Sequence, residues 1–125
     1  MFLRLNHQNL DIYNASINFV VECYKFSKHL PVEEKFGMIS QVRRAALSVH
    51  LNIGEGFSKK SPAERKRYFE ISRESIIEID AAFDVAEKLN YFSNYNKDNL
   101  KTTMLRTYEI LSGLIKALSK SSLTN

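Results

Sequence analysis

A cluster of basic residues in the middle of the chain has the clearest chemical potential. Within SKKSPAERKRY, five cations lie in nine residues, where a helix is expected to begin. The helix macrodipole disfavours Lys and Arg there, whereas cations beside free helix N–H groups form a surface suited to phosphate. With one further arginine assisting, the predicted nucleic-acid-binding residues are Arg43, Lys59, Lys60, Arg65, Lys66 and Arg67. The alternative is an ordinary solvated charged face.

Charge is unevenly distributed along the chain. Residues 35–73 carry nine Lys and Arg against three Glu, whereas residues 74–98 carry six acidic residues against two Lys. The net charge of the whole chain is only +4. This polarity suits either the binding of a polyanion at one end or self-association through opposite charges.

Side chains that could catalyse a reaction or bind a metal are scattered. His7, His29 and His50 have no metal-binding partner at helical spacing, and there is no Glu-x-x-His motif. The single cysteine, Cys23, is expected to be a small buried hydrophobe. The chain also lacks a P-loop, a Rossmann glycine pattern and a Gly-x-Ser-x-Gly elbow. We therefore expect no enzyme activity, no metal and no cofactor.

The elements that must position these residues are helices. With only four glycines and two prolines, the chain shows apolar spacing of three and four residues throughout. We predict helices at about residues 10–29, 32–57, 62–90 and 97–120, followed by a disordered Ser/Thr-rich end. The clearest boundary is Ser61 as N-cap, with Pro62 next and Glu64 completing a capping box. Short connections predict one all-α domain over residues 1–125, an up-down-up-down antiparallel four-helix bundle.

The second helix also carries a line of small or polar residues beside its apolar seam: Gln41, Ala45, Ser48, Asn52 and Glu55 or Gly56. Small residues let another backbone approach closely. Gly54 and Gly56 each cost about 1 kcal/mol of helix propensity relative to alanine, which suggests a packing role. Gly56 could instead begin the C-terminal cap of the helix. Gly54 is harder to explain in that way, because it precedes the cap.

Antiparallel packing of the second and third helices predicts which charges face one another. Glu55 is expected near Arg65, and Arg44 near Glu74 and Glu78. We favour interhelix salt bridges that set the register of the two helices. A catalytic role for Glu55 is the less favoured alternative.

The sequence also bears on location. The longest stretches without a charge span 10 residues, about half of a membrane span. No secretory signal is recognisable at the start, and one cysteine cannot form an internal disulfide. We expect a cytoplasmic protein with no membrane partner.

Two segments resemble a known family: LPVEEKFGMISQVRRAALSVHLNIGEGF and ERKRYFEISRESIIEIDAAFDVAEKLNYF. They are similar to the four-helix bundle proteins encoded in intervening sequences of bacterial 23S rRNA genes. The resemblance rests on Pro31, Glu34, Gln41, Arg44, Ala45, Ser48, Asn52, Glu55 and Gly56, followed by Tyr68, Phe69, Ser75 and Glu78. The chain departs from the family pattern at His50, Gly54 and Glu74. A tight contact at Glu74 would require different packing or neutralisation by Arg44.

The resemblance carries expectations about assembly. Related accessory variability determinant proteins of diversity-generating retroelements form homopentamers that associate with nucleic acid and a reverse transcriptase. The resemblance therefore implies a homo-oligomer, with a pentamer favoured, and a possible protein partner such as a reverse transcriptase. It also implies close helix or subunit packing at Gln41, Arg44, Ala45, Ser48, Asn52, Glu55, Gly56, Ser75 and Glu78.

Together these features predict a non-enzymatic, homo-oligomeric helical bundle that binds RNA or DNA through its basic surface. The alternative is a structural or protein-interaction scaffold with no direct nucleic-acid role. In that case the uneven charge would serve self-assembly.

Overall fold

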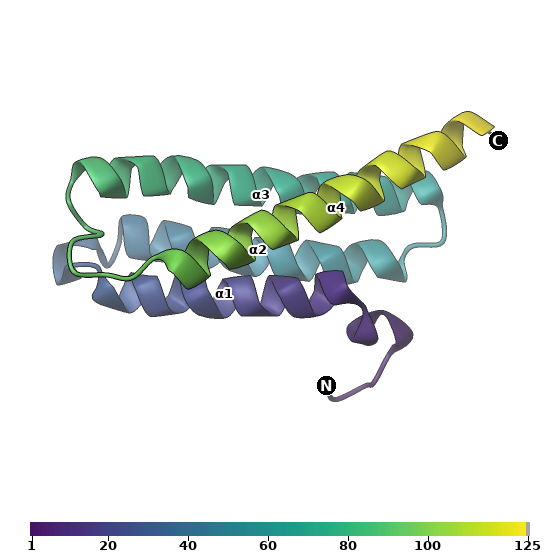
Figure 1. Ribbon diagram of the computed structural model, residues 1–125. Helices are drawn as coiled ribbons and strands as arrows, with labels where there is room; N and C mark the ends of the chain where they lie inside the picture. The colour runs from purple at the N-terminus through teal and green to yellow at the C-terminus, as the bar shows by residue number, and fades with distance from the viewer. Residues whose placement is uncertain (125) are drawn as a thin grey trace.

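The computed structural model describes residues 1–124, with side chains described up to residue 120. Four helices form the fold: α1 (Asp11–His29), α2 (Met38–Ser58), α3 (Pro62–Lys88) and α4 (Asp98–Thr124). Two short 3-10 turns, η1 (Asn6–Asn9) and η2 (Val32–Glu34), precede α1 and α2. Residues 1–124 contain no strand. Successive helices run in opposite directions (Figure 1), which confirms the predicted all-α, up-down-up-down bundle.

The four helices enclose one hydrophobic core. Each packs mainly against its neighbours in the chain, and α1 also packs against α4. In Figure 1, α4 lies obliquely across the other helices. The largest fully buried side chains come from all four helices and include Phe19, Phe26, Ile53, Phe69, Ile76, Ile79 and Leu111. Burial of each such side chain contributes about 1.5–3 kcal/mol relative to exposure.

The second helix begins later than predicted. It was expected near residue 32, but η2 occupies that position and α2 starts at Met38. The carboxylate of Glu34 explains the new start, because its Oε1 accepts the backbone N–H of Met38 at 3.2 Å. A negative charge at this end is also favoured by the helix macrodipole. Tyr91 Oη donates to Glu34 Oε2 at 2.8 Å, which ties the connection after α3 to the start of α2.

Both ends of α3 have the geometry of helix caps. Ser61 is its N-cap, as predicted, with Oγ accepting the backbone N–H of Glu64 at 3.3 Å. The helix ends at Lys88, two residues before the predicted end. Asn90 follows in the left-handed conformation (φ 61°), and the N–H of Tyr91 bonds to the Ala86 carbonyl at 2.9 Å. This is a Schellman motif, with asparagine in the place that glycine most often occupies.

The last helix is longer than predicted. The spacing of apolar residues indicated a helix to residue 120 and disorder after residue 118. In the structure α4 continues to Thr124, and the disorder expected after residue 118 stays a prediction. The final residue of the predicted disordered end, Asn125, lies outside the described residues.

Candidate nucleic-acid interface

The short connection between α2 and α3 lies at one end of the bundle. It spans residues 59–61, and the N-terminal turn η1 lies at the same end (Figure 1). Four of the six predicted phosphate-binding cations lie here, and we call this surface the basic end: Lys59, Lys60, Lys66 and Arg67. Lys60 and Arg67 are exposed, whereas Lys59 and Lys66 are partly buried. All four lie within two helical turns of the free N–H groups at the start of α3.

An aromatic ring lies among these cations. Lys59 Nζ is 5.2 Å from the centre of the Tyr68 ring, and the guanidinium carbon of Arg67 is 5.7 Å from it. Tyr68 is partly exposed, whereas its neighbour Phe69 is fully buried. The spacing of Tyr68 and Phe69 in the sequence fits core packing better than base stacking, so Tyr68 is not among the predicted binding residues. Its position, one residue before a core phenylalanine, is the signal that could have placed it at the edge of the core.

Arg65 does not join the basic end, because its side chain caps the preceding helix. Its Nη2 donates to the Lys59 carbonyl at 2.9 Å and to the Phe57 carbonyl at 3.5 Å. The guanidinium also lies over the Phe57 ring, at 5.8 Å from its centre. A cation at the C-terminus of α2 is favoured by the macrodipole of that helix. Part of the predicted phosphate-binding charge therefore stabilises the turn itself.

Arg43 also lies apart from the predicted surface. It is 16 residues before Lys59 in the sequence, which corresponds to about 24 Å along a helix. Its Nε donates to Ser27 Oγ at 2.7 Å, and its guanidinium lies 4.9 Å from the centre of the Tyr24 ring. These contacts join α2 to α1. The structure thus separates Arg43 from the other predicted cations.

The small polar line of α2 faces α3 within the same chain. Ser48 Oγ and Ser75 Oγ are 2.8 Å apart at its centre. Asn52 Nδ2 donates to the Ser48 carbonyl at 2.8 Å. Towards the start of α2, Gln41 Nε2 donates to Glu78 Oε1 at 2.6 Å. The Ser48–Ser75 and Gln41–Glu78 contacts tie α2 to α3 in the antiparallel register that the sequence predicted, whereas the Asn52 bond lies within α2.

Two other members of the line are small because space is limited. Ala45 is buried, and Gly56 lies against α3. A Cβ atom at Gly56 would lie 2.5 Å from Phe69 Cε1 and 3.3 Å from the Arg65 carbonyl oxygen. A Cβ atom at Gly54 would have no neighbour within 4 Å. The close packing expected more strongly at Gly54 is therefore found at Gly56.

The predicted interhelix salt bridges are absent from the described part of the chain. Glu55 pairs with Lys59 at 3.8 Å, one turn along its own helix, while Arg65 bonds to backbone carbonyls. Arg44 Nη2 donates to Gln41 Oε1 at 2.7 Å and reaches α3 only through the bond from Gln41 to Glu78. Glu74, the departure from the family pattern, is exposed and needs no neutralising partner. The helix register was correct, but the charged side chains bind other groups.

A cluster of rings fixes the N-terminal turn to this end of the bundle. His7 stacks on Phe57 with ring centres 5.6 Å apart, and Tyr13 contacts the His50 ring at 4.5 Å. The Nδ1 atom of His50 is 2.7 Å from Ser16 Oγ. Burial lowers the pKa of His50, and the nearby charge of His7 lowers it further. Neutral His50 is thus favoured, and it acts as a packing group beside a pocket of about 390 Å³.

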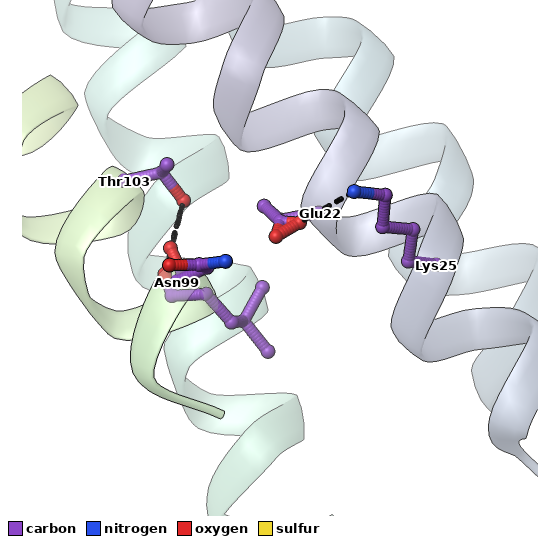
Figure 2. A network of polar contacts seen from close by, with 5 residues as sticks. Glu22, Lys25, Asn99 and Thr103 are labelled. Carbon is purple, nitrogen blue, oxygen red and sulfur yellow. Dashed lines mark hydrogen bonds and ion pairs between the residues drawn. The ribbon is translucent and has the colours of Figure 1, made fainter. Parts of the chain in front are cut away.

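Glu22 is the carboxylate placed between α1 and α4 (Figure 2). Its Oε2 is buried without a hydrogen-bond partner and lies 3.5 Å from Lys25 Nζ. On the facing part of α4, Thr103 Oγ1 donates to the Asn99 carbonyl at 2.8 Å, within its own helix. Burial raises the pKa of the Cys23 thiol, and the charge of Glu22 raises it further. The thiol beside this carboxylate is therefore held in its neutral form.

The described residues do not gather the ligands of a metal ion. No group of three or more His, Cys, Asp or Glu side chains within them could hold one. Cys23 is fully buried in the core. None of the described helices combines the length and apolar character needed to cross a membrane.

A protein-family comparison adds to this picture of the site. Residues 8–113 match the model of a family described as 23S rRNA-intervening sequence protein. The matched part runs from η1 into α4 and contains the whole basic end and the α2–α3 contact. A search of curated proteins finds no match to the chain.

Proposed function

Because the chain belongs to the family of 23S rRNA-intervening sequence proteins, we propose that it is a non-enzymatic, homo-oligomeric bundle that binds RNA or DNA through its basic end. A pentamer is the favoured assembly, and the cytoplasm is the proposed location. Binding is mainly electrostatic, since Lys and Arg that neutralise phosphates release condensed counterions. Affinity therefore falls steeply as salt is added.

The observation that carries this proposal is the surplus of cations at the basic end. Among the residues that the structure describes, Glu55 forms one ion pair, with Lys59 at 3.8 Å. Within the described residues, Lys60, Lys66 and Arg67 have no ion-pair partner. Lys and Arg near the N-terminus of α3 are unfavourable for the macrodipole of that helix, so the macrodipole does not explain their placement. A bound phosphate would relieve their mutual repulsion and accept bonds from the free N–H groups of the first turn.

The partly exposed ring of Tyr68 supports nucleic acid over other polyanions. Base stacking on an aromatic side chain contributes about 1–3 kcal/mol and tolerates any sequence. Two cations already border this ring, so a stacked base would have its phosphates close to positive charge. The proposed site therefore combines phosphate binding with one stacking position.

The non-enzymatic part of the proposal is supported by the bonds of Glu55, the alternative catalytic carboxylate, and of Asn52, the polar side chain that precedes it on α2. Glu55 pairs with Lys59, and Asn52 bonds to Ser48. Each group therefore has a structural partner that accounts for its position. A catalytic carboxylate of this kind would need a general acid, a base or a metal beside it.

A scaffold that binds proteins is the second candidate function. Exposed apolar side chains favour it, among them Leu51 on α2, Ile77 on α3 and Leu105 on α4. Contiguous exposed apolar surface is typical of protein–protein contact sites. A protein partner such as a reverse transcriptase would bind such surfaces, whereas nucleic acid would bind the basic end.

The test measures binding of a structured rRNA fragment and of duplex DNA by fluorescence anisotropy across a salt series. The variant Lys60→Gln/Arg67→Gln removes two exposed cations of the basic end. For duplex DNA, each lost phosphate contact lowers the slope of log K against log salt by about 0.9, so we expect a decrease of about 1.8. The oligomer mass, measured by light scattering in the same buffers, should not change.

The matched control removes two exposed cations at the opposite end of the bundle, in the variant Lys35→Gln/Lys88→Gln. It has the same net charge as the test variant but an intact basic end. The control should retain the wild-type salt slope. Equal slopes for the two variants, or no binding at low salt, would refute the proposed interface.

A further inference from the structure

A pocket of about 390 Å³ lies between the N-terminal turn η1, the first turn of α1 and the last turns of α2. We call it the N-terminal pocket. Its lining combines the rings of His7, Tyr13 and His50 with the carboxylate of Glu55 and two leucines. Small-molecule sites have volumes of about 300–1,000 Å³ and a similar mixture of apolar surface and a few polar groups. The pocket therefore has the size and the lining of a site for a small planar ligand.

The three rings of the pocket hold one another in place. The centre of the Tyr13 ring lies 4.5 Å from that of His50 and 5.5 Å from that of His7. His7 is in turn stacked on Phe57, with 8° between the ring planes. Rings that are already ordered lose little conformational entropy when a ligand binds to them. Tyr and His rings are also surfaces on which unpaired bases of RNA stack.

The hydrogen bonds of His50 determine what its second ring nitrogen can do. Ser16 Oγ donates its single proton to the Tyr13 carbonyl at 2.9 Å. The contact of 2.7 Å between Ser16 Oγ and His50 Nδ1 therefore has Nδ1–H as its donor. Because burial lowers the pKa of His50 and favours the neutral ring, Nε2 is then an acceptor. Within residues 1–120 Nε2 has no hydrogen-bond partner, so a ligand in the pocket can donate to it.

Glu55 supplies a second acceptor. Its Oε2 lies 3.8 Å from Lys59 Nζ and 3.5 Å from Ser58 Oγ, whereas Oε1 bonds to none of the described residues. The side chain is 56% exposed, so a ligand can reach it. The lining described by the structure contains no Lys or Arg that would neutralise the carboxylate from inside the pocket. A ligand that matches both acceptors must present two hydrogen-bond donors on one edge.

Gly54 leaves space in the wall of the pocket. It lies one turn after His50 and one turn before Ser58, and all three line the pocket. A Cβ atom at Gly54 would have no neighbour within 4 Å. Packing within the chain therefore does not require glycine here, although glycine lowers the helix propensity of α2. Space for a ligand accounts for this residue, because a longer side chain would enter the pocket.

Lys59 connects the pocket to the basic end. Its Nζ lies 3.8 Å from Glu55 Oε2 and 5.2 Å from the centre of the Tyr68 ring. A strand whose phosphates lie on the basic end therefore has the pocket within reach of a neighbouring base. Such a base must be unpaired, because pairing in a duplex occupies the edge that would meet the two acceptors.

We propose that the N-terminal pocket binds an unpaired guanine base of the nucleic acid held at the basic end. The inference rests on the proposed function and identifies the part of the ligand that this pocket recognises. Guanine has two adjacent donors, N1–H and the N2 amino group, which match His50 Nε2 and the Glu55 carboxylate. Adenine and cytosine present an amino group beside an acceptor, and uracil has a single donor. Stacking on the rings tolerates any base, whereas these hydrogen bonds select guanine.

The test titrates guanosine monophosphate into protein whose histidines carry an isotope label, and follows the ring signals by NMR. The chain has three histidines, and two of them line the pocket. His29 ends α1 at the opposite end of the bundle and provides an internal control (Figure 1). The signals of His7 and His50 should shift, and those of His29 should not. Inosine monophosphate lacks the N2 amino group and should bind about tenfold more weakly, which corresponds to about 1.4 kcal/mol.

Two variants test the pocket, and circular dichroism checks the helix content of each. Gly54→Leu fills the pocket and should abolish the shifts. Its matched control is Gly113→Leu, because Gly113 also has open space around its Cβ position but lies on α4 outside the pocket. Glu55→Ala should weaken binding of guanosine monophosphate about tenfold, which corresponds to about 1.4 kcal/mol. The same change frees Lys59 from its ion pair, so binding of ribose 5-phosphate should instead become stronger.

Three results would overturn the assignment: no shift of His7 and His50, equal shifts with ribose 5-phosphate or adenosine monophosphate, or binding that Gly54→Leu leaves unchanged. Failure of the pocket is distinguishable from failure of the basic end. Duplex DNA offers no unpaired base, so Gly54→Leu should keep the wild-type salt slope, which depends on Lys60 and Arg67. Loss of nucleotide binding with an unchanged slope would refute the pocket alone. Nucleotide binding without any binding of duplex DNA or rRNA would refute the basic end alone.

Discussion

Replacing Gly56 by alanine should distort the contact between α2 and α3. The added Cβ atom would lie 2.5 Å from Phe69 Cε1 and 2.8 Å from Phe69 Cδ1. The ring cannot move freely, because Phe69 is 1% exposed and packs edge-on against Phe57 at 5.0 Å. On the other side, the Arg65 carbonyl oxygen would be 3.3 Å away and belongs to the backbone of α3. The two helices would have to separate locally.

The glycine two residues earlier provides a control for the change in helix propensity. Alanine at either position stabilises the helix by about 1 kcal/mol relative to glycine. At Gly54 the new Cβ atom meets nothing within 4 Å, so the full gain should appear. At Gly56 overpacking of the core costs about 1–3 kcal/mol and offsets the gain. We expect the free energy of unfolding to rise by about 1 kcal/mol for Gly54→Ala and to fall by up to about 2 kcal/mol for Gly56→Ala.

Urea unfolding followed by circular dichroism, at one fixed protein concentration, measures both values. The difference between the variants isolates the overpacking cost, because the propensity gain is common to both. In a Phe69→Leu background the smaller side chain should reduce the loss of stability caused by Gly56→Ala. A double-mutant cycle then measures the interaction free energy between positions 56 and 69. Equal stabilisation by both alanines would refute the tight contact inferred at Gly56.

Three further changes test other contacts. Ser61→Ala should lower the free energy of unfolding by about 1 kcal/mol through loss of the α3 N-cap, measured by urea unfolding. Arg65→Gln should lower the free energy of unfolding by about 1 kcal/mol, because the carbonyls at the end of α2 lose a charged donor. Arg67→Gln should change this free energy by less than about 0.5 kcal/mol and should weaken RNA binding instead. The reverse pattern would contradict the placement of the two arginines. The lowered pKa of His50 means that the unfolded chain binds the proton more tightly. Stability should therefore be full above about pH 6.5, decrease as the pH falls below that value, and lose this dependence in His50→Gln.

Local sequence signals predicted the helices well, because their causes lie within a few residues. The Ser61 cap, with Pro62 behind it, is an example that needed no tertiary information. The predicted start of α2 was wrong, because the first backbone N–H of the helix is bonded by a side chain that precedes the helix and folds back onto it. Glu34 bonds to the N–H of Met38 and is held by Tyr91 from a distant part of the chain. No local pattern reveals that contact.

The basic cluster was predicted as a group, but the roles of its members depend on packing. Arg65 and Arg67 are two residues apart and were equivalent in the sequence. In the structure Arg65 bonds to the carbonyls of Phe57 and Lys59 at the C-terminal end of α2, whereas Arg67 is exposed beside Tyr68. The difference arises from the direction in which each side chain leaves α3 relative to the end of α2. It becomes visible only when the two helices are placed together.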